Sequence, residues 1–456
     1  MFRINPQNLI PLFHWNFKRL IFEAKTKILK SKIYDSYHLA RKDLLSSNVN
    51  TLNFERRTQL VNYAYQHIPF YKNKYMGIPG VADIRSEEDF LKLPTVTRDD
   101  LANNFEQFVA EEVSPSQYER VTSSGSTGRP VSVLQDPDFP YTTLQWRILD
   151  WWGVKPYENQ AFIYRYRRPQ MKRLGNIFLW WPTRRAFMAG SEMNLENAKK
   201  FADKINRIKP ALLQGYVDVV YEFALFLLDN DIKIHPPKMV WVTSAPLFEN
   251  QRQIMAKAFG APVCDQYGNT EVFTIAAECP KQHGLHIMHD AVHVEVVDAN
   301  NRPLPAGESG KIVVTDLRNK VFPLIRYETG DRGKLLDYVC ECGIPLPLMD
   351  NVRGRQSVTL KTPSSLAIRS EHLALMFEKH MKCIRQIQLL QQADYSVSFC
   401  YVVDVEGDDD AIANEVELIM QDLKTKVRGE IQIKAVRVDD IQRKGNKKPL
   451  LISHVS

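Results

Sequence analysis

The stretch that decides the fold is KMVWVTSAPLFENQRQIMAKAFGAPVCDQYG, residues 238–268. It holds two apolar runs typical of strands, 238–245 and 261–268, and a helical run between them that ends at Gly260, a residue type common at helix C-caps. Strand, helix and strand at this spacing are typical of parallel strands joined by a crossover helix. The sequence therefore predicts an α/β fold class with a parallel sheet.

The segments before this stretch are predicted from apolar spacing and from helix-boundary residues. Residues 1–75 are mainly helical in pattern, and Pro69 should end or kink the helix predicted over 60–68. Thr97 precedes two acidic residues at a further predicted helix N-terminus. From about 120 to 350, β-rich runs alternate with helical stretches, which indicates one large multi-layer domain.

The pattern changes after Arg355. Residues 292–298 and 311–317 still indicate two antiparallel strands of the large domain. Beyond the change come three strand-like runs and one long amphipathic helix, residues 384–391, 395–404, 431–438 and 411–427. We therefore expect a basic helical N-terminal extension, a large domain with parallel sheets and a small mobile α+β C-terminal domain, residues 1–55, 56–355 and 356–456.

The composition is that of an ordinary globular protein. Of 456 residues, 44% are hydrophobic and 25% are charged, which excludes a wholly disordered, collagenous or coiled-coil chain. No apolar window is long enough for a membrane span. The first apolar run is interrupted by charged residues, which is not expected of a signal peptide. Six unevenly spaced cysteines without an export signal favour a reducing, cytoplasmic location over a disulfide framework.

The net charge of +7 lies almost entirely in the first 45 residues, where nine lysines and arginines face three acidic residues. The other 411 residues are nearly neutral, at +1. A basic amphipathic segment of this kind can contact an anionic membrane surface or nucleic acid, although a solvated helix packed on the main domain is the more common explanation. We expect no nucleic-acid partner.

Two loops have sequences that could bind the phosphates and the base of a nucleotide. Residues 122–130, TSSGSTGRP, combine glycines and hydroxyls, so their backbone N–H groups can approach phosphate oxygens; an ordinary flexible turn is the alternative. This loop lacks the Gly-Lys-Ser/Thr ending of a Walker loop. Residues 266–272, QYGNTEV, follow a predicted parallel strand, where α/β sheets place ligands. There Tyr267 offers a ring to a base and Glu271 a carboxylate to Mg²⁺, unless the segment is only a surface turn.

Three further segments add weaker signals. Asp331, in PLIRYETGDRGKL, can accept the two hydroxyls of a ribose or belong to a plain Gly-Asp turn. Arg355, in VRGRQ, falls at the inferred domain boundary and could be an exposed linker residue. The basic run QRKGNKKPLL, residues 442–451, could be a solvated tail.

In this order, the signals resemble the adenylate-forming superfamily, and most closely its phenylacetate-CoA ligase and capsular-polysaccharide-biosynthesis branch. The resemblance covers nearly the whole chain beyond about residue 55. It includes the helical segments YAYQHIPFYKNKY, KLPTVTRDDLANNF and IKPALLQGYVDVVYEFA, and the ribose-type segment KIVVTDLRNKVFPLIRYETGD.

The resemblance implies a role for each matching residue. The α-phosphate would contact Thr270, Mg²⁺ would bind Glu271, and the ribose would bind Asp331 with Arg355 nearby. Lys447 would be the catalytic lysine of the small domain, with Lys448 as the alternative register. The ATP phosphates would be held by Ser124, Gly125, Ser126, Thr127 and Gly128, and the adenine would be framed by Ser244, Ala245, Pro246, Tyr267, Gly268 and Asn269.

The implied activity is ATP- and Mg²⁺-dependent activation of a carboxylate as an acyl-adenylate, followed by transfer to coenzyme A. The implied setting is capsular or surface polysaccharide synthesis. An amine or hydroxyl of a sugar precursor is an alternative acceptor, and direct transfer of AMP to a hydroxyl is an alternative reaction. A catalytically inactive nucleotide-binding member is the non-enzyme alternative. Gln356-Ser357 stands where the family has an acidic hinge, which bears on the thioester-forming step rather than on ATP binding.

A separate cysteine and histidine set suits tetrahedral Zn²⁺ in a structural site: Cys279, His286, Cys340 and Cys342. His283 and His289 are competing ligands, and buried reduced cysteines are the alternative to any metal. The aromatic residues Trp151, Trp152, Trp180, Trp181 and Tyr216 could line an acyl pocket, although core packing is more common for paired tryptophans.

Overall fold

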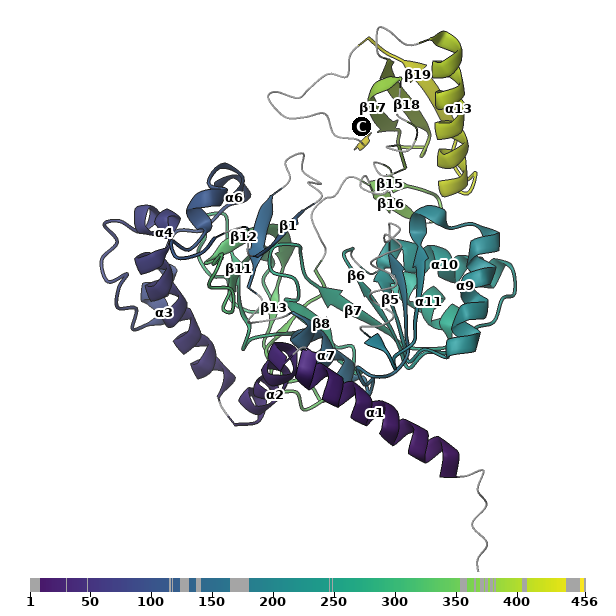
Figure 1. Ribbon diagram of the computed structural model, residues 1–456. Helices are drawn as coiled ribbons and strands as arrows, with labels where there is room; N and C mark the ends of the chain where they lie inside the picture. Colours follow the sequence, from purple (N-terminus) through teal and green to yellow (C-terminus); the bar gives the residue numbers. More distant parts are fainter. Residues whose placement is uncertain are drawn as a thin grey trace, which may run out of the picture. The chain divides into compact units, whose positions relative to one another are not determined.

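The computed structural model describes most of the chain in two compact units (Figure 1). One unit comprises Met1–Thr122 with Ser132–Gly354, and the other Ser123–Val131 with Arg355–Ser456. The residues whose structure is described are 9–29, 31–46, 48–114, 116, 118–123, 131–136, 141–164, 180–245, 247, 249–352, 359–364, 366–369, 373, 376, 377, 380, 383–403, 408–439 and 452–454.

The first unit is a mixture of helices and strands. Its helices are α1 (Leu9–Leu29), α2 (Ser31–Ser46), α3 (Val49–His67), α4 (Pro69–Lys74), α5 (Glu87–Leu91), α6 (Arg98–Asn103), η2 (Phe105–Phe108), α7 (Thr142–Trp151), η4 (Gly190–Glu192), α9 (Leu195–Ile208), α10 (Val217–Asp229) and α11 (Glu249–Phe259). Its strands are β1 (Glu119–Thr122), β2 (Ser132–Gln135), β3 (Gln160–Tyr164), β4 (Arg185–Ala189), β5 (Leu212–Tyr216), β6 (Met239–Thr243), β7 (Val263–Tyr267), β8 (Ala276–Glu278), β9 (Leu285–Ile287), β10 (Val292–Val297), β11 (Gly310–Asp316), β12 (Tyr327–Gly333), β13 (Leu335–Leu336) and β14 (Leu348–Met349).

The large sheet of this unit is part parallel and part antiparallel. Its described strands follow the order β13-β14-β9-β8-β7-β6-β5-β3-β4. From β4 to β7 neighbouring strands are parallel, and from β7 to β13 they are antiparallel. The prediction from residues 238–268 is confirmed, because β6 and β7 pair in parallel with α11 between them. Gly260 ends α11 with a φ of 61° and donates its N–H to the Ala256 carbonyl.

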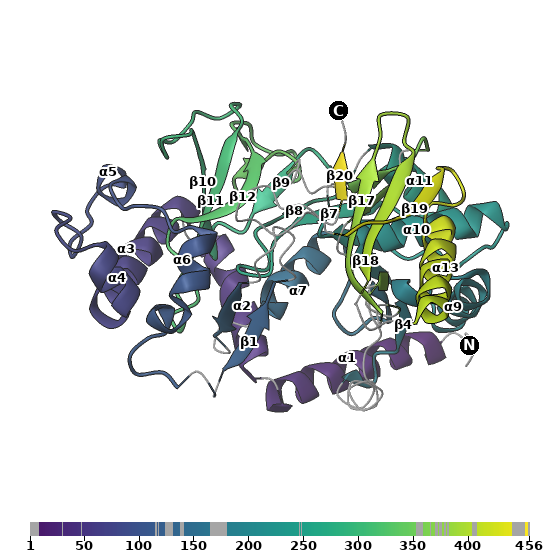
Figure 2. The same ribbon diagram turned by 90° about the horizontal axis from the view of Figure 1, so that it is seen from above.

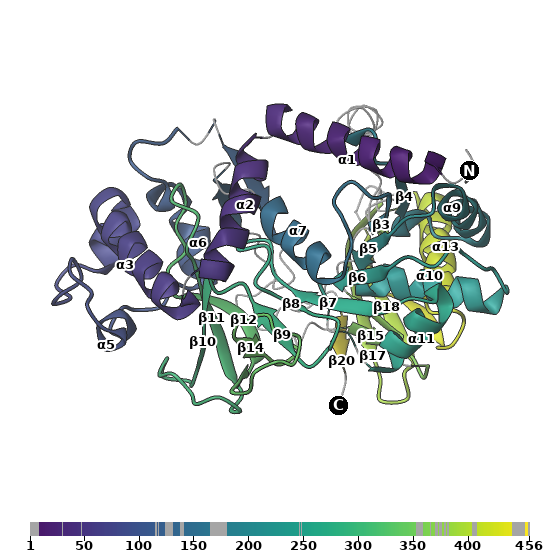
Figure 3. The same cartoon turned by 90° about the horizontal axis from the view of Figure 1, so that it is seen from below.

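Helices cover the parallel strands, of which β6 and β7 are buried along nearly their whole length. The helices α9, α10 and α11 lie side by side next to them (Figure 2). In α9 the buried residues recur at spacings of three and four, so one face packs inward: Ala198, Phe201, Ala202, Ile205 and Ile208. In Figure 3, α7 lies between α2 and the strands of the sheet. An α/β fold class is therefore confirmed.

Two predicted local features are present at the start of the unit. Pro69 ends one helix and begins the next, because α3 stops at His67 and α4 begins at the proline. Thr97 caps α6: its hydroxyl accepts the N–H of Asp100, and the Asp100 carboxylate accepts the N–H of Thr97. The expected antiparallel strands are β10 and β11, which form a further sheet with β12.

The first two helices dock on the rest of this unit. On α2, the Tyr37 hydroxyl donates to the Asp150 carboxylate of α7, and the carbonyl of Ala40 accepts a guanidinium N–H of Arg147 at 3.2 Å. Arg147 also forms two hydrogen bonds, of 2.6 and 2.7 Å, with the fully buried Asp290 before β10. One buried arginine therefore links α2, α7 and the β10 region.

The second unit is a small sheet with one long helix. Its described elements are β15 (Thr359–Lys361), β16 (Ala367–Arg369), β17 (Ile384–Gln391), β18 (Val397–Val403), α13 (Asp409–Lys426), β19 (Ile433–Arg437) and β20 (Ile452–His454). Four of the described strands form the order β19-β18-β17-β20. Among the described helices of the whole chain, none combines the length and the hydropathy needed to cross a membrane.

Candidate functional site

The loops after β6 and β7 lie next to each other because these two strands are paired in parallel. The hydroxyl of Thr243, the last residue of β6, donates to the carbonyl of Gln266 in β7 at 3.0 Å. Ser244 follows with a φ of 72°, in the left-handed region that non-glycine residues rarely adopt. At β7 the sheet also changes from parallel to antiparallel, and the carboxyl ends of such strands are where α/β sheets bind ligands.

The turn after β7 is tight and leaves one polar atom without a partner. A Cβ on Gly268 would lie 1.6 Å from the carbonyl oxygen of Phe273, so only glycine fits. Asn269 closes the turn: its side-chain oxygen accepts the N–H of Val272 at 2.7 Å, and its carbonyl accepts that of Phe273 at 2.8 Å. The buried Nδ2 of Asn269 has no hydrogen-bond partner among the described residues. A buried amide of this kind indicates a bound water or ligand.

Tyr267 and Asp331 meet although they are 64 residues apart. The Tyr267 hydroxyl donates to Oδ2 of Asp331 at 2.9 Å and lies 3.4 Å from the hydroxyl oxygen of Thr329. The N–H of Asp331 donates to the same Thr329 hydroxyl at 3.1 Å. The Tyr267 side chain is held at its polar end and is 9% exposed, so little of its ring is open to solvent.

Glu271 is buried beside two partners that sequence reasoning missed. Its Oε1 accepts hydrogen bonds from Arg98, at 3.0 Å, and from the Tyr327 hydroxyl, at 3.3 Å. Arg98 is the first residue of α6 and lies 173 residues from Glu271 in the chain, so no local spacing could have linked them. A carboxylate has two oxygens, so Glu271 can pair with Arg98 and still offer an oxygen to a cation.

Behind the site, β7 carries a buried carboxyl group that sequence reasoning did not select. Arg252 makes two hydrogen bonds to Glu278, of 2.9 and 2.7 Å, and the N–H of Asp265 donates to Glu278 at 2.8 Å. Burial, reinforced by the Glu278 charge, raises the pKa of the Asp265 carboxyl to about 8. This raised pKa favours the neutral form of Asp265, next to the Arg252–Glu278 ion pair.

The structure brings the expected Tyr267, Gly268, Asn269, Thr270 and Glu271 into one turn, with Asp331 beside it. Ser244 and Ala245 follow the neighbouring strand β6. The other expected site residues lie outside the described residues: Ser124, Gly125, Ser126, Thr127, Gly128, Pro246, Arg355, Lys447 and Lys448.

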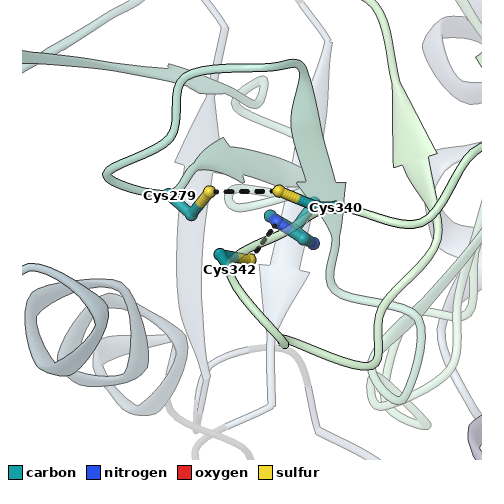
Figure 4. A group of neighbouring side chains, drawn as sticks. Cys279, Cys340 and Cys342 are labelled. Carbon is teal, nitrogen blue, oxygen red and sulfur yellow. Dashed lines mark hydrogen bonds between the residues drawn. The ribbon is translucent and has the colours of Figure 1, made fainter.

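A second group joins three cysteines and a histidine (Figure 4). The ligand atoms of Cys279, His286, Cys340 and Cys342 all lie within 4.8 Å of one another. The Cys279 and Cys340 sulfurs are 3.6 Å apart, and the Cys342 sulfur is 3.2 Å from Nε2 of His286. All six cysteines of the chain are described, and none forms a disulfide. Neither His283 nor His289, the competing ligands considered from sequence, belongs to the group.

The group connects short strands at the antiparallel end of the large sheet. Cys279 directly follows β8, His286 is in β9, and Cys340 and Cys342 lie in the turn between β13 and β14. Nδ1 of His286 lies 3.3 Å from the carbonyl oxygen of Leu346. When Nδ1 carries the proton and donates it there, the lone pair of Nε2 faces the cysteines.

The five aromatic residues considered for an acyl pocket lie in separate places. The Trp151 ring is 5.6 Å from that of His286, and the indole N–H of Trp152 donates to the Glu278 carbonyl. Trp180 stacks near Phe22 of α1, whereas Trp181 is 55% exposed and Tyr216 ends β5. For the first three, the structure favours packing over a shared acyl pocket.

No protein-family model matches the chain. Among curated proteins, it is 24% identical to protein CapK of Staphylococcus aureus, over 70% of this chain and 71% of that one. It is 25% identical to a phenylacetate-coenzyme A ligase of Aromatoleum evansii, over 81% of this chain and 82% of that one. It is 26% identical to the phenylacetate-coenzyme A ligase of Escherichia coli, over 67% of this chain and 71% of that one.

Among solved structures, the chain resembles 2-hydroxyisobutyryl-CoA ligase in complex with 2-HIB-AMP and CoA. The TM-score is 0.65 at 18% identity, with 91% of this chain and 92% of the other covered. This likeness shows the fold, and the curated relatives confirm the resemblance inferred from the motifs. In sequence the chain is thus similar to CapK and to phenylacetate-CoA ligases over at least two thirds of its length, and in fold it is similar to 2-hydroxyisobutyryl-CoA ligase.

Proposed function

We propose that this chain is an AMP-forming ligase that uses ATP to activate a carboxylic acid as an acyl-adenylate. One observation supports this most directly: the Tyr267–Asp331 hydrogen bond joins the end of β7 to β12 beside a turn with an unpartnered buried amide. The Asp331 carboxylate, which can accept hydrogen bonds from ribose hydroxyls, then lies at the carboxyl end of a parallel strand. The Asn269 amide, which can hydrogen-bond the edge of a base, lies beside it. The sequence similarity to acid–CoA ligases points to the same chemistry.

The described residues would act on charge and position. A carboxylate approaching a triphosphate is repelled by it, so the site must offset negative charge before the carboxylate attacks the α-phosphorus. In this proposal Asp331 holds the ribose, the turn at Gly268 and Asn269 frames the base, and Thr270 donates to the α-phosphate. Arg98 orients the Glu271 carboxylate, which is the hard oxygen ligand that Mg²⁺ prefers. Mg²⁺ held by Glu271 would neutralise phosphate charge.

The remaining contributions come from residues outside the described part of the chain. Ser124 to Gly128 would supply N–H and hydroxyl donors to the phosphates, and Pro246 and Arg355 would border the nucleotide. Lys447 would approach the carboxylate and α-phosphate as charge develops there. Coenzyme A is the proposed acceptor, and a role in surface polysaccharide synthesis is suggested only by the name CapK. The reduced cysteines fit a cytoplasmic setting.

The test is ATP–pyrophosphate exchange with a panel of carboxylic acids, followed by mass spectrometry with and without coenzyme A. We expect exchange that depends on the acid, and an acyl-CoA product when coenzyme A is added. An amide or ester product that forms only when an amine or sugar is added would show that this compound, rather than coenzyme A, is the acceptor. Exchange that never depends on an acid would contradict acyl activation and favour AMP transfer to a hydroxyl. No exchange with any acid, despite ATP binding, would favour the inactive alternative.

We also propose that Cys279, His286, Cys340 and Cys342 hold a structural Zn²⁺. Three sulfurs and one imidazole nitrogen within 4.8 Å of one another fit the tetrahedral donor set of zinc. Four protein ligands leave no open position for a reacting water, so the ion would hold the β8, β9 and β13–β14 segments together. The histidine orientation by the Leu346 carbonyl is the usual supporting contact of a zinc ligand.

Metal content measured by mass spectrometry tests this site. We expect about one zinc ion per purified chain, lost in Cys342→Ser together with part of the thermal stability. Cys383→Ser is the matched control, because Cys383 is also partly buried but lies in the other unit. A wild-type chain without zinc, or a Cys342→Ser chain that keeps it, would contradict the assignment.

A further inference from the structure

The helix α1 has a docked inner face. Phe22 and Thr26 are each 6% exposed, and the Phe22 ring lies 5.7 Å from Trp146 and 6.4 Å from Trp180. The Lys18 ammonium donates to the side-chain oxygen of Asn159 at 2.7 Å. The inner face is therefore fixed on the first unit.

Outside its docked contacts, α1 carries large apolar side chains in solvent: Leu20 and Ile28 lie on the outer face, and Leu29 is exposed at the end of the helix. Leu20, Ile28 and Leu29 are 63%, 78% and 59% exposed, and Trp181, which is 55% exposed, lies beside the helix. We call these four residues the α1 patch. Figure 3 shows α1 running along one side of the first unit, next to α7. A soluble surface rarely concentrates such residues on one exposed helix without a partner.

The apolar pattern extends along the helix in the sequence. Leu20, Ala24 and Ile28 follow one another at intervals of four residues. This is the spacing of a single stripe on an α-helix, and it is separate from Phe22 and Thr26 of the docked face. The helix thus has two apolar stripes, and the docked domain uses one of them.

Positive charge accompanies the α1 patch. The Lys25 ammonium donates to the Trp181 carbonyl at 3.3 Å and lies 6.0 Å from the centre of its ring. Lys27 is exposed on the same helix, and the first 45 residues carry an excess of six positive charges. Lysines beside exposed apolar and tryptophan side chains are typical of helices that lie in the interface of an anionic membrane.

We propose that the α1 patch binds an anionic lipid surface, with α1 lying in the membrane interface and the first unit on its polar side. Leu20 and Ile28 would enter the boundary of the acyl chains and Leu29 and Trp181 would lie at its edge, while Lys25 and Lys27 contact lipid phosphates. A second copy of the chain is a poorer occupant, because two such patches would bring the same positive charge face to face. This inference does not depend on the proposed enzymatic activity.

Co-sedimentation of the full chain with vesicles tests the proposal. We expect binding to vesicles of phosphatidylglycerol mixed with phosphatidylcholine, much weaker binding to phosphatidylcholine alone, and loss of binding between about 0.1 and about 0.5 M salt. The double variant Leu20→Ser/Ile28→Ser should bind at least about tenfold more weakly, because it removes two inserted side chains. Lys27→Gln should weaken binding on the order of fivefold.

The matched control is Met76→Ser/Val339→Ser, which removes apolar side chains that are 72% and 90% exposed elsewhere on the first unit. It should bind vesicles like the wild type, and both double variants should keep the wild-type melting temperature. Negligible binding by the wild type, equal binding to both kinds of vesicle, or equal loss in both double variants would overturn the proposal. So would a wild-type dimer that Leu20→Ser/Ile28→Ser converts to a monomer in light scattering, since self-association would then occupy the patch.

Discussion

At the scale of single residues, Asp331 is the side chain whose loss should be most specific for nucleotide binding. It is oriented by the Tyr267 hydroxyl and by its own N–H bond to Thr329. Hydrogen bonds to a charged group contribute about 1.5–3 kcal/mol, so Asp331→Ala should raise the KM for ATP by roughly ten- to a hundredfold. Steady-state kinetics with ATP varied at saturating acid measures this.

Two further variants separate binding from positioning. Tyr267→Phe removes one neutral donor to Asp331, so the KM for ATP should rise by less, roughly two- to tenfold. Asp298→Ala, in an exposed turn, should leave the KM for ATP unchanged. An Asp331→Ala enzyme with the wild-type KM would show that this carboxylate does not hold the nucleotide.

Asp265 should give the folded chain a distinctive dependence on pH. Its folded pKa is raised to about 8, against about 4 in an unfolded chain, so the folded state keeps a proton that the unfolded chain has lost. The contribution of Asp265 to stability is complete below about pH 4 and is lost as the pH rises through about 8. Asp265→Asn keeps the group neutral, so its melting temperature should fall less than that of the wild type from about pH 5 to about pH 8.

Thermal melts of both proteins across this range make the comparison. Other titrating groups are common to the two proteins, so the difference between their slopes isolates Asp265. Asp298→Asn serves as the control because its pKa is lowered by the Arg302 N–H, and it therefore titrates below this range. Parallel curves for Asp265→Asn and the wild type would mean that Asp265 is ionised in the folded protein.

At the scale of elements, Arg147 and Asp290 decide how firmly α2 and α7 are held to the β10 region. Asp290 is fully buried, and although burial alone would raise its pKa, Arg147 holds it well below the usual range. Asp290→Asn would leave Arg147 and the neighbouring Arg318 without this buried negative charge. Such changes cost about 3–5 kcal/mol, so the free energy of unfolding should fall by that amount in urea denaturation.

The comparison for this prediction is an ion pair of similar length in solvent. Glu196 and Lys200 are 2.5 Å apart on α9 with both side chains mostly exposed. Glu196→Gln should therefore leave the denaturation midpoint unchanged. If both variants destabilise the protein equally, burial is not the reason for the effect of Asp290.

The elements that sequence could predict are those with a local periodic signal. The run 238–268 predicted β6, α11 and β7 because each is at least five residues long and has its own pattern. The two- and three-residue strands β8, β9, β13 and β14 were not predicted, because so few residues carry no period. The pairing of β7 with β8 completes the turn at Gly268, so part of the site also escaped prediction.

Long-range contacts escaped for a related reason. Glu271 was selected from its loop, but its partner Arg98 stands in a capped helix that gave only a helix signal. The cysteine and histidine set could be proposed because thiolates and imidazoles are rare and chemically distinctive. An arginine that pairs with a carboxylate far away in the chain cannot be told from other arginines in a single sequence.

At the scale of the whole molecule, the proposed reaction draws on both units. The described residues that we propose to bind nucleotide, from Ser244 to Asp331, belong to the first unit, whereas the proposed phosphate loop and Lys447 belong to the second. The lysine is proposed to act on charge that develops in the transition state, so it should contribute to rate more than to ATP binding. Lys447→Ala should lower acid-dependent pyrophosphate exchange by roughly a hundredfold or more, while calorimetry shows ATP binding close to that of the wild type.

Lys448→Ala is the matched variant, because it removes the same charge one residue away. It should keep most of the exchange activity when Lys447 is the catalytic lysine, and the reverse result would move the role to Lys448. Loss of ATP binding in Lys447→Ala would instead make this lysine part of the ground-state nucleotide site. The residues of the first unit that are proposed to bind nucleotide are oriented by contacts within that unit, because Tyr267 donates to Asp331 and Arg98 donates to Glu271.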